Sequence, residues 1–126
     1  MIGCSNFAAA QQVSRIKEEM TTPEFLYKIV SVEQWQASQF CPVIVLSSMD
    51  NDFIHLSSES QLAHVAQKFW QHIDYVVLKL ASNKLNGQLV YETNPGGSNK
   101  YYHLYNGSIP LDAVVEKTLV SAQQSK

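Results

Sequence analysis

The stretch FIHLSSESQLAHVAQKFW, residues 53–70, joins a strand pattern directly to a helix pattern. In a strand, successive side chains point to opposite faces of the sheet. Ile54 and Leu56 therefore share one face, which suits packing against a hydrophobic core. His55 and Ser57 share the other face. Two interpretations are open there: the pair lines a cleft, or His55 is a half-buried histidine that bonds a backbone carbonyl.

The second half of this stretch is typical of an amphipathic helix. Ser58 suits the N-cap position, and Gln61 follows it at the spacing of a capping box. The N-terminus of such a helix has free N–H groups and the positive end of the helix dipole. A phosphate or pyrophosphate group could therefore bind there, beside His55. The apolar stripe of the helix comprises Leu62, Val65, Ala66 and Phe69.

The rest of the chain predicts an α+β fold, because strand patterns are interrupted by only two short helix patterns. Ser31 and Gln34 form a second capping-box pair, at the start of a helix over residues 31–40. The dipeptide Asn86–Gly87 predicts a hairpin turn between two neighbouring strands. The other expected strands cover residues 24–30, 74–81 and 88–93, and one or two more lie within 101–120.

The chain divides into one domain and two terminal segments. Residues 1–23 repeat apolar side chains at helical spacing and end at Pro23, so we expect an N-terminal helical extension. It could pack on the domain, form a dimer contact or be loosely ordered. Residues 24–120 form the single α+β domain, and residues 121–126 form a short tail. The oligomeric state is not predicted by any pattern in the chain.

Composition narrows the class of protein. Of the 126 residues, 45% are hydrophobic and 16% are charged, which is typical of a folded domain with a sizeable core. The net charge is -2, Arg15 is the only arginine and the lysines are scattered, so we expect no general nucleic-acid binding. No segment is long and apolar enough to span a membrane, and the start of the chain lacks the features of a signal peptide.

Cysteine and histidine spacing predicts no metal site. Cys4 and Cys41 form no C-x-x-C motif, which argues against both a zinc site and a disulfide framework. His64 and His72 are too far apart in sequence to share a metal on one helix turn. We therefore expect a reduced, cytoplasmic protein that requires no cofactor.

Further candidate binding residues lie in the last third of the domain. In the segment YYHLY, Tyr101, His103 and Tyr105 alternate onto one face and could stack on a planar ligand. The alternative is a sheet edge decorated with amphipathic aromatic residues. Glu92 ends a strand before the loop NPGG, where its carboxylate could accept ribose hydroxyls or act as a base.

Lys28 lies on the apolar face of the first expected strand, with Leu26 and Val30. A lysine in such a position either extends its ammonium group to the surface along the apolar side chains or lines the cleft. We favour the first interpretation.

Several segments, in this order, resemble a bacterial family of proteins of unknown function, family 952. They are LYKIVS, FIHLSSESQLAHVAQKFW, DYVVLKL, VYET and YYHLYNGSIPLDAVV, which together span about residues 25–118. The resemblance implies a compact fold similar to ADP-ribosyltransferases, in which a split pair of sheets holds NAD in a cleft. It also implies that His55 and Ser57 belong to the central motif of that cleft, and that Glu92 and His103 belong to later motifs.

This sequence departs from the family pattern at the first strand. Relatives often have histidine where Lys28 stands, at a position that would contact a ribose in the transferase fold. Asp52 replaces the usual glycine before FIH, and Tyr102 replaces proline before HLY. These changes put a transferase activity in doubt. The absence of arginine beyond Arg15 argues against the RNA 2′-phosphotransferase reaction of relatives that carry a similar HLS strand.

Three functions fit these patterns. The first is an enzyme that transfers ADP-ribose or hydrolyses NAD, with NAD as its substrate. His55 and Glu92 would then be the catalytic residues, and the residues that bind substrate would be Lys28, Ser57, Tyr101, His103 and Tyr105. The second is a binding module for a nucleotide-like molecule that lacks the chemistry. The third is a metal-independent phosphoesterase with His55 and His103 as its acid and base, although HLYN lacks the hydroxyl residue of two-histidine phosphoesterases.

Overall fold

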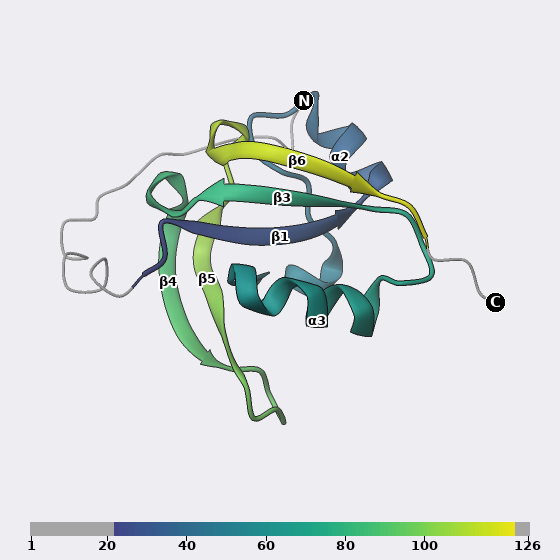
Figure 1. The fold of residues 1–126 in the computed structure, drawn as a ribbon. Helices are drawn as coiled ribbons and strands as arrows, with labels where there is room; N and C mark the ends of the chain where they lie inside the picture. The colour runs from purple at the N-terminus through teal and green to yellow at the C-terminus, as the bar shows by residue number, and fades with distance from the viewer. Residues whose placement is uncertain (1–21, 123–126) are drawn as a thin grey trace.

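The computed structural model describes residues 22–122, in which six strands form two small antiparallel sheets (Figure 1). This arrangement confirms the α+β class. Helices α2 (Val32–Ser38) and α3 (Glu59–Phe69) are the two α-helices of this part of the chain. The first sheet has the order β1 (Phe25–Ser31), β3 (Tyr75–Ala81), β6 (Val114–Val120), and the second has the order β2 (Ile54–Leu56), β5 (Lys100–Ser108), β4 (Asn86–Thr93).

The hydrophobic core fills the space between the sheets. Strand β3 lies at the centre of its sheet, as its apolar sequence suggests, and its alternate residues are buried. The second sheet faces the core with Ile54 and Leu56, so the predicted face of this strand is confirmed. The fully or nearly buried members of the core are Leu26, Val30, Ile44, Ile54, Leu56, Val76, Leu78, Leu80, Leu104, Ile109 and Ala113.

An isolated pair of residues links the two sheets by backbone hydrogen bonds. Tyr27 of β1 and Ser57, just beyond β2, exchange both of their backbone hydrogen bonds, at 2.8 and 2.9 Å. Because β1 and β2 run antiparallel at this point, the residues on either side of the pair are brought close together. Lys28 and His55 are thereby placed near each other, although 27 positions separate them in the sequence.

Both predicted capping boxes are found at helix starts. The side chain of Ser31 accepts a hydrogen bond from the backbone of Gln34, whose own side chain accepts one from Ser31, at 3.0 and 2.9 Å. At the start of α3, the side chain of Gln61 accepts a hydrogen bond from the backbone N–H of Ser58 at 3.0 Å. Each helix therefore begins where the sequence predicts.

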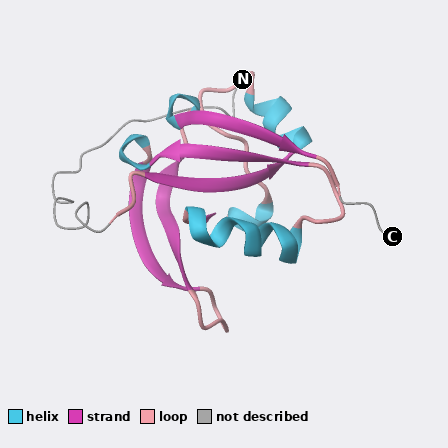
Figure 2. Cartoon of the chain, viewed as in Figure 1, coloured by secondary structure: helices cyan, strands magenta, loops and turns pink. Residues whose placement is uncertain are grey.

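Helix α3 lies along β1, beside the projecting β4–β5 hairpin (Figures 1 and 2). None of its residues is fully buried, and the last residue of the apolar stripe, Phe69, is 60% exposed. The stripe is therefore not covered by the core in the way that its periodicity predicts.

The prediction of a hairpin turn at Asn86–Gly87 is wrong. After β3 a 3₁₀ turn, Ser82–Lys84, carries the chain to the second sheet, where β4 pairs with β5 and not with β3. Gly87 has a φ of +116° and crosses closely over β5, where a Cβ would lie 2.6 Å from the carbonyl oxygen of Tyr105. Glycine is needed here for a bulge in the sheet, and not for a turn.

Some expectations concern the ends of the chain. Residues 1–21 and 123–126, which hold most of the predicted extension and tail, lie outside the described residues. Cys41 takes part in a disulfide, so the expectation of reduced cysteines is wrong at this position, and Cys4 lies outside the described residues. Within residues 22–122, no helix has both the length and the apolar character that crossing a membrane requires.

Truncating the central core strand should destabilise the protein strongly. The side chain of Leu78 on β3 is completely buried, so we expect Leu78→Ala to lower the free energy of unfolding by about 2–5 kcal/mol. Leu119→Ala, on the edge strand β6 where the side chain is 65% exposed, is the matched control and should change it by about 0.5 kcal/mol or less. Urea denaturation measures both variants, and equal losses would contradict this placement of the core.

Candidate functional site

A pocket of about 660 Å³ lies between β1, the end of β2 and the second half of α3. The loop that joins β4 to β5, residues 94–99, and the segment around the 3₁₀ helix η2 (Ser48–Asp50) complete its walls. This volume is typical of sites for small molecules and cofactors.

The apolar wall of the pocket comes mainly from α3. Val65, Phe69 and Trp70 line it, which explains why the stripe of this helix is not buried in the core. Met49 lines the pocket from η2 and is 68% exposed. An aromatic and a thioether side chain at the surface of one pocket provide apolar contact area for a planar group.

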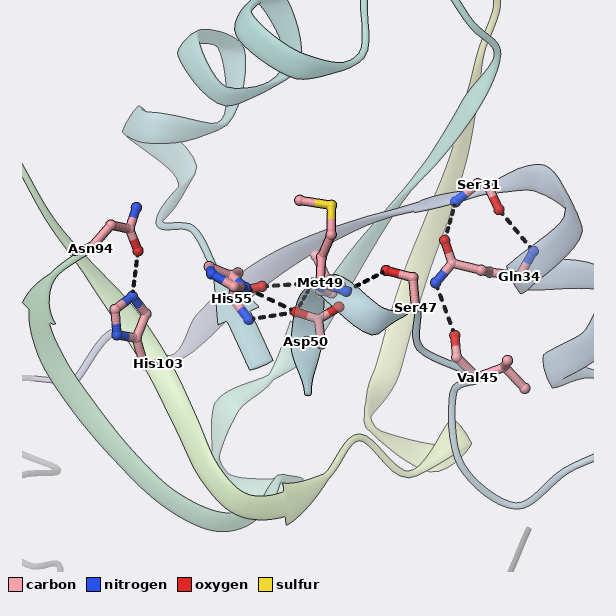
Figure 3. A network of polar contacts seen from close by, with 10 residues as sticks. Ser31, Gln34, Val45, Ser47, Met49, Asp50, His55, Asn94 and His103 are labelled. Carbon is pink, nitrogen blue, oxygen red and sulfur yellow. Dashed lines mark hydrogen bonds and ion pairs between the residues drawn. The ribbon is translucent and has the colours of Figure 1, made fainter. Parts of the chain in front are cut away.

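His55 lines the pocket, and its side chain is 40% exposed. Its Nδ1 lies 3.0 Å from Oδ1 of Asp50, and the backbone N–H of His55 donates to the same oxygen at 3.0 Å (Figure 3). Nε2 makes no hydrogen bond to any residue within 22–122. The prediction that His55 faces a cleft is thus supported by its position, although the carboxylate that holds it was not predicted.

Lys28 contradicts the interpretation that its ammonium group extends to the surface. The side chain is 8% exposed, and Nζ donates to Oδ1 of Asp50 at 2.9 Å and to the carbonyl oxygen of His55 at 3.0 Å. Its strand face packs into the core with Leu26 and Val30, so no route to water is open along that face. The lysine instead lines the pocket.

Burial and ion pairing shift the pKa of Lys28 in opposite directions, and the same is true of Asp50. Burial lowers the pKa of Lys28, and the nearby charge of Asp50 and its hydrogen bond offset only part of this effect. Burial alone would raise the pKa of Asp50. The hydrogen bonds from His55 and the charge and hydrogen bond of Lys28 outweigh burial and lower it. Asp50 therefore stays a carboxylate at neutral pH.

Ser57 and Tyr101 also line the pocket, as predicted. Ser57 is 7% exposed, and its backbone groups are occupied by Tyr27. Its hydroxyl makes no hydrogen bond to a residue of the described part of the chain, so it is available to a ligand. Tyr101 stands at the start of β5, across the pocket from the sheet junction.

The remaining predicted site residues form a second cluster that does not line the pocket. His103 is completely buried, with Nδ1 2.7 Å from Oε2 of Glu92 and Nε2 2.8 Å from Oδ1 of Asn94. The phenol of Tyr105 donates to the same oxygen of Glu92. These hydrogen bonds lower the pKa of Glu92, the bond from Tyr105 having the larger effect, and the same bond raises the pKa of Tyr105.

The two clusters are adjacent. His55 and His103 are directly opposite each other across β2 and β5, with ring centroids 5.6 Å apart. The ring of Phe53 stacks on that of His103, with centroids 4.0 Å apart, and its centroid also lies 4.7 Å from that of His55. Asn94 bonds His103 and at the same time lines the pocket, so the second cluster supports one wall of the site (Figure 3).

The predicted anion site at the start of α3 is not where the pocket lies. The pocket is lined by the helix from His64 onward, and not by its first turn. The N–H of Ser58 is occupied by Gln61, and Glu59 places a negative charge in the first turn, which opposes anion binding there. The lysines of the pocket are instead Lys68 and the paired Lys28, and His64 also lines it.

Asp50 is the functional residue that the sequence did not reveal. It lies in the polar segment SSMDND, five positions before His55, where an acidic residue is also expected in any solvated turn. The useful signal was the buried lysine: a cation on a core-facing strand requires a carboxylate partner. Within residues 22–122, no group of three or more metal-ligating side chains could hold a metal ion.

Comparison with known proteins places the chain by sequence and by fold. The family model described as "Protein of unknown function (DUF952)" matches residues 29–117. The crystal structure of protein CC0527 from Caulobacter crescentus is similar, with a TM-score of 0.65 and 28% identity over 75% of this chain and 84% of that one. Its solution NMR structure has a TM-score of 0.64 at the same identity, over 76% and 84%. A search of curated proteins finds no match.

Removing only one member of the buried ion pair should be costly. In Asp50→Leu the ammonium group of Lys28 loses its partner, and we expect a loss of about 3–5 kcal/mol in the free energy of unfolding. The double variant Lys28→Met/Asp50→Leu replaces the pair by apolar side chains and should recover most of that loss. Urea denaturation at pH 7 tests this, and a double variant no more stable than Asp50→Leu would contradict it.

The ion pair also predicts how stability depends on pH. The pKa of Asp50 is lower in the folded chain than in the unfolded chain, so its contribution is complete above the unfolded value of about 3.9. It is lost as the pH falls from there through the folded pKa. Wild type should therefore lose more stability in acid than Lys28→Met/Asp50→Leu does, as measured by thermal unfolding, whereas parallel curves would contradict the pKa shift.

Proposed function

The chain belongs to the DUF952 family, and on that premise we propose that its pocket binds a nucleotide-like small molecule, with NAD and ADP-ribose as the first candidates. One observation carries the proposal: His55 is fixed by Asp50 at one nitrogen and presents the other, without a described partner, in a pocket with apolar walls. A polar group held in this way within an apolar hollow is the usual design of a small-molecule site.

Other features of the pocket fit the parts of a nucleotide. Met49, Phe69 and Trp70 offer apolar surface for a base or a nicotinamide ring. Lys68 lines the pocket without a carboxylate partner among the described residues, and its ammonium group suits a phosphate. The two small sheets joined at Tyr27 and Ser57 are consistent with the split-sheet fold that the family resemblance implies.

The contacts of Glu92 favour a binding module over an ADP-ribosyl-transferring enzyme. Stabilising an oxocarbenium centre requires a carboxylate that faces the ligand. Glu92 does not line the pocket, and one of its oxygens already accepts hydrogen bonds from His103 and Tyr105. The carboxylate that does line the pocket, Asp50, is paired with Lys28.

The phosphoesterase has less support. It requires two histidines that both reach the ligand, as general acid and general base. His103 is completely buried, and both of its ring nitrogens lie within hydrogen-bond distance of Glu92 and Asn94. His55 therefore has no second histidine as a partner at that position.

Ligand binding should be visible as a shift in thermal unfolding. With NAD or ADP-ribose at about a hundred times its dissociation constant, we expect the folded state to gain roughly 2.7 kcal/mol, which raises Tm by roughly 10 °C. His55→Ala should lose the shift. His72→Ala, a histidine that does not line the pocket, is the matched control and should keep it.

Nicotinamide alone and inorganic phosphate, tested in the same assay, separate recognition of the ring from recognition of the phosphates. Assay of the bound samples for released nicotinamide then distinguishes turnover from simple binding. No shift with any of these compounds would overturn the proposal of a nucleotide-like ligand.

A further inference from the structure

The hydrogen bonds of Asp50 determine which nitrogen of the His55 ring carries the hydrogen, and hence what kind of ligand group the ring can bind. A single oxygen, Oδ1, accepts from Nζ of Lys28 at 2.9 Å and from the backbone N–H of His55 at 3.0 Å, and Nδ1 of the same ring lies 3.0 Å away. A carboxylate only accepts hydrogen bonds. The hydrogen of a neutral His55 ring is therefore held at Nδ1, and Nε2 carries the lone pair.

We propose that Asp50 is a positioning residue that holds His55 in the Nδ1–H tautomer, so that the pocket recognises a ligand hydroxyl that donates to Nε2. The recognition of a hydroxyl rests on the proposed binding function, whereas the role of Asp50 does not. A phosphate or carbonyl oxygen has no hydrogen to donate, so it cannot pair with this lone pair. The hydroxyls of a ribose can.

Several contacts keep this arrangement rigid. Asp50 is 4% exposed and is held by Lys28, which also bonds the carbonyl oxygen of His55, so carboxylate and histidine share one anchor. The ring centroid of His55 lies 4.7 Å from that of Phe53 in a tilted contact and 5.6 Å from that of His103 in a T-shaped contact. A ring held at its backbone and at Nδ1, with two aromatic neighbours, presents Nε2 in one direction.

Nitrogen NMR of the histidine rings tests the first part of the proposal in the free protein. In the whole chain labelled with ¹⁵N-histidine, at a pH where the rings are neutral, we expect His55 to favour the Nδ1–H form by about tenfold or more, because its acceptor is charged. His64, which is exposed and makes no hydrogen bond to a described residue, serves as the internal reference. A His55 ring with its hydrogen on Nε2 would overturn the proposal.

Two variants show whether Asp50 is the cause. Lys28→Met/Asp50→Leu removes the carboxylate without leaving an unpaired buried charge, and its His55 should lose the preference and resemble His64. Lys28→Met alone keeps the carboxylate and should retain the Nδ1–H form. If the double variant also retains that form, another group sets the tautomer and the proposal fails.

Adding ADP-ribose to the labelled protein tests the proposed hydrogen bond from a ligand hydroxyl to Nε2 of His55. The resonance of Nε2 should move while Nδ1 stays protonated. A rise in Tm without any change at Nε2 would show that the ligand binds but does not donate to His55, which overturns the hydroxyl contact. If neither ADP-ribose nor NAD binds, the proposed function fails, and the tautomer of the free protein still decides the role of Asp50.

Discussion

The charge of Lys28 is the constraint on which the site depends. A lysine on a strand face that packs into a core cannot reach water, so the fold must bring an anion and a carbonyl to its ammonium group. The 3₁₀ helix η2 and the start of β2 supply them, as Asp50 and the backbone of His55. The same carboxylate then orients the ring of His55. The need to pair the buried charge of Lys28 therefore determines which polar groups line this side of the pocket.

The junction of the sheets makes this possible. Tyr27 and Ser57 exchange backbone hydrogen bonds, and this sets the register between β1 and β2. Lys28 and His55 consequently lie on either side of Asp50. The second cluster, around His103, supports the other side of the site through Asn94. Glu92 and His103 of this cluster do not line the pocket themselves.

Patterns between neighbours in the sequence predicted the helices and strands. The arrangement of the site depends on contacts between residues that are far apart in the sequence. The capping pairs, the two-residue alternation of β2 and the central position of β3 depend on neighbours in sequence, and they were confirmed. The hairpin at Asn86–Gly87 was wrong because the dipeptide serves a bulge as well as a turn. The hydrogen-bond partners of Glu92 and Lys28 were not predicted, because they come from other strands or turns and residue type alone does not reveal such partners.

The uncovered apolar stripe of α3 has a thermodynamic consequence for the proposed ligand binding. Val65, Phe69 and Trp70 line the pocket, and no residue of α3 is fully buried, so this helix has little core beneath it. If the proposed ligand binds, it covers the apolar side chains of α3 that the core leaves open. Such binding would remove apolar surface from water and carry a negative change in heat capacity. It would also slow amide hydrogen exchange in α3 more than in β3, whose alternate residues are already buried.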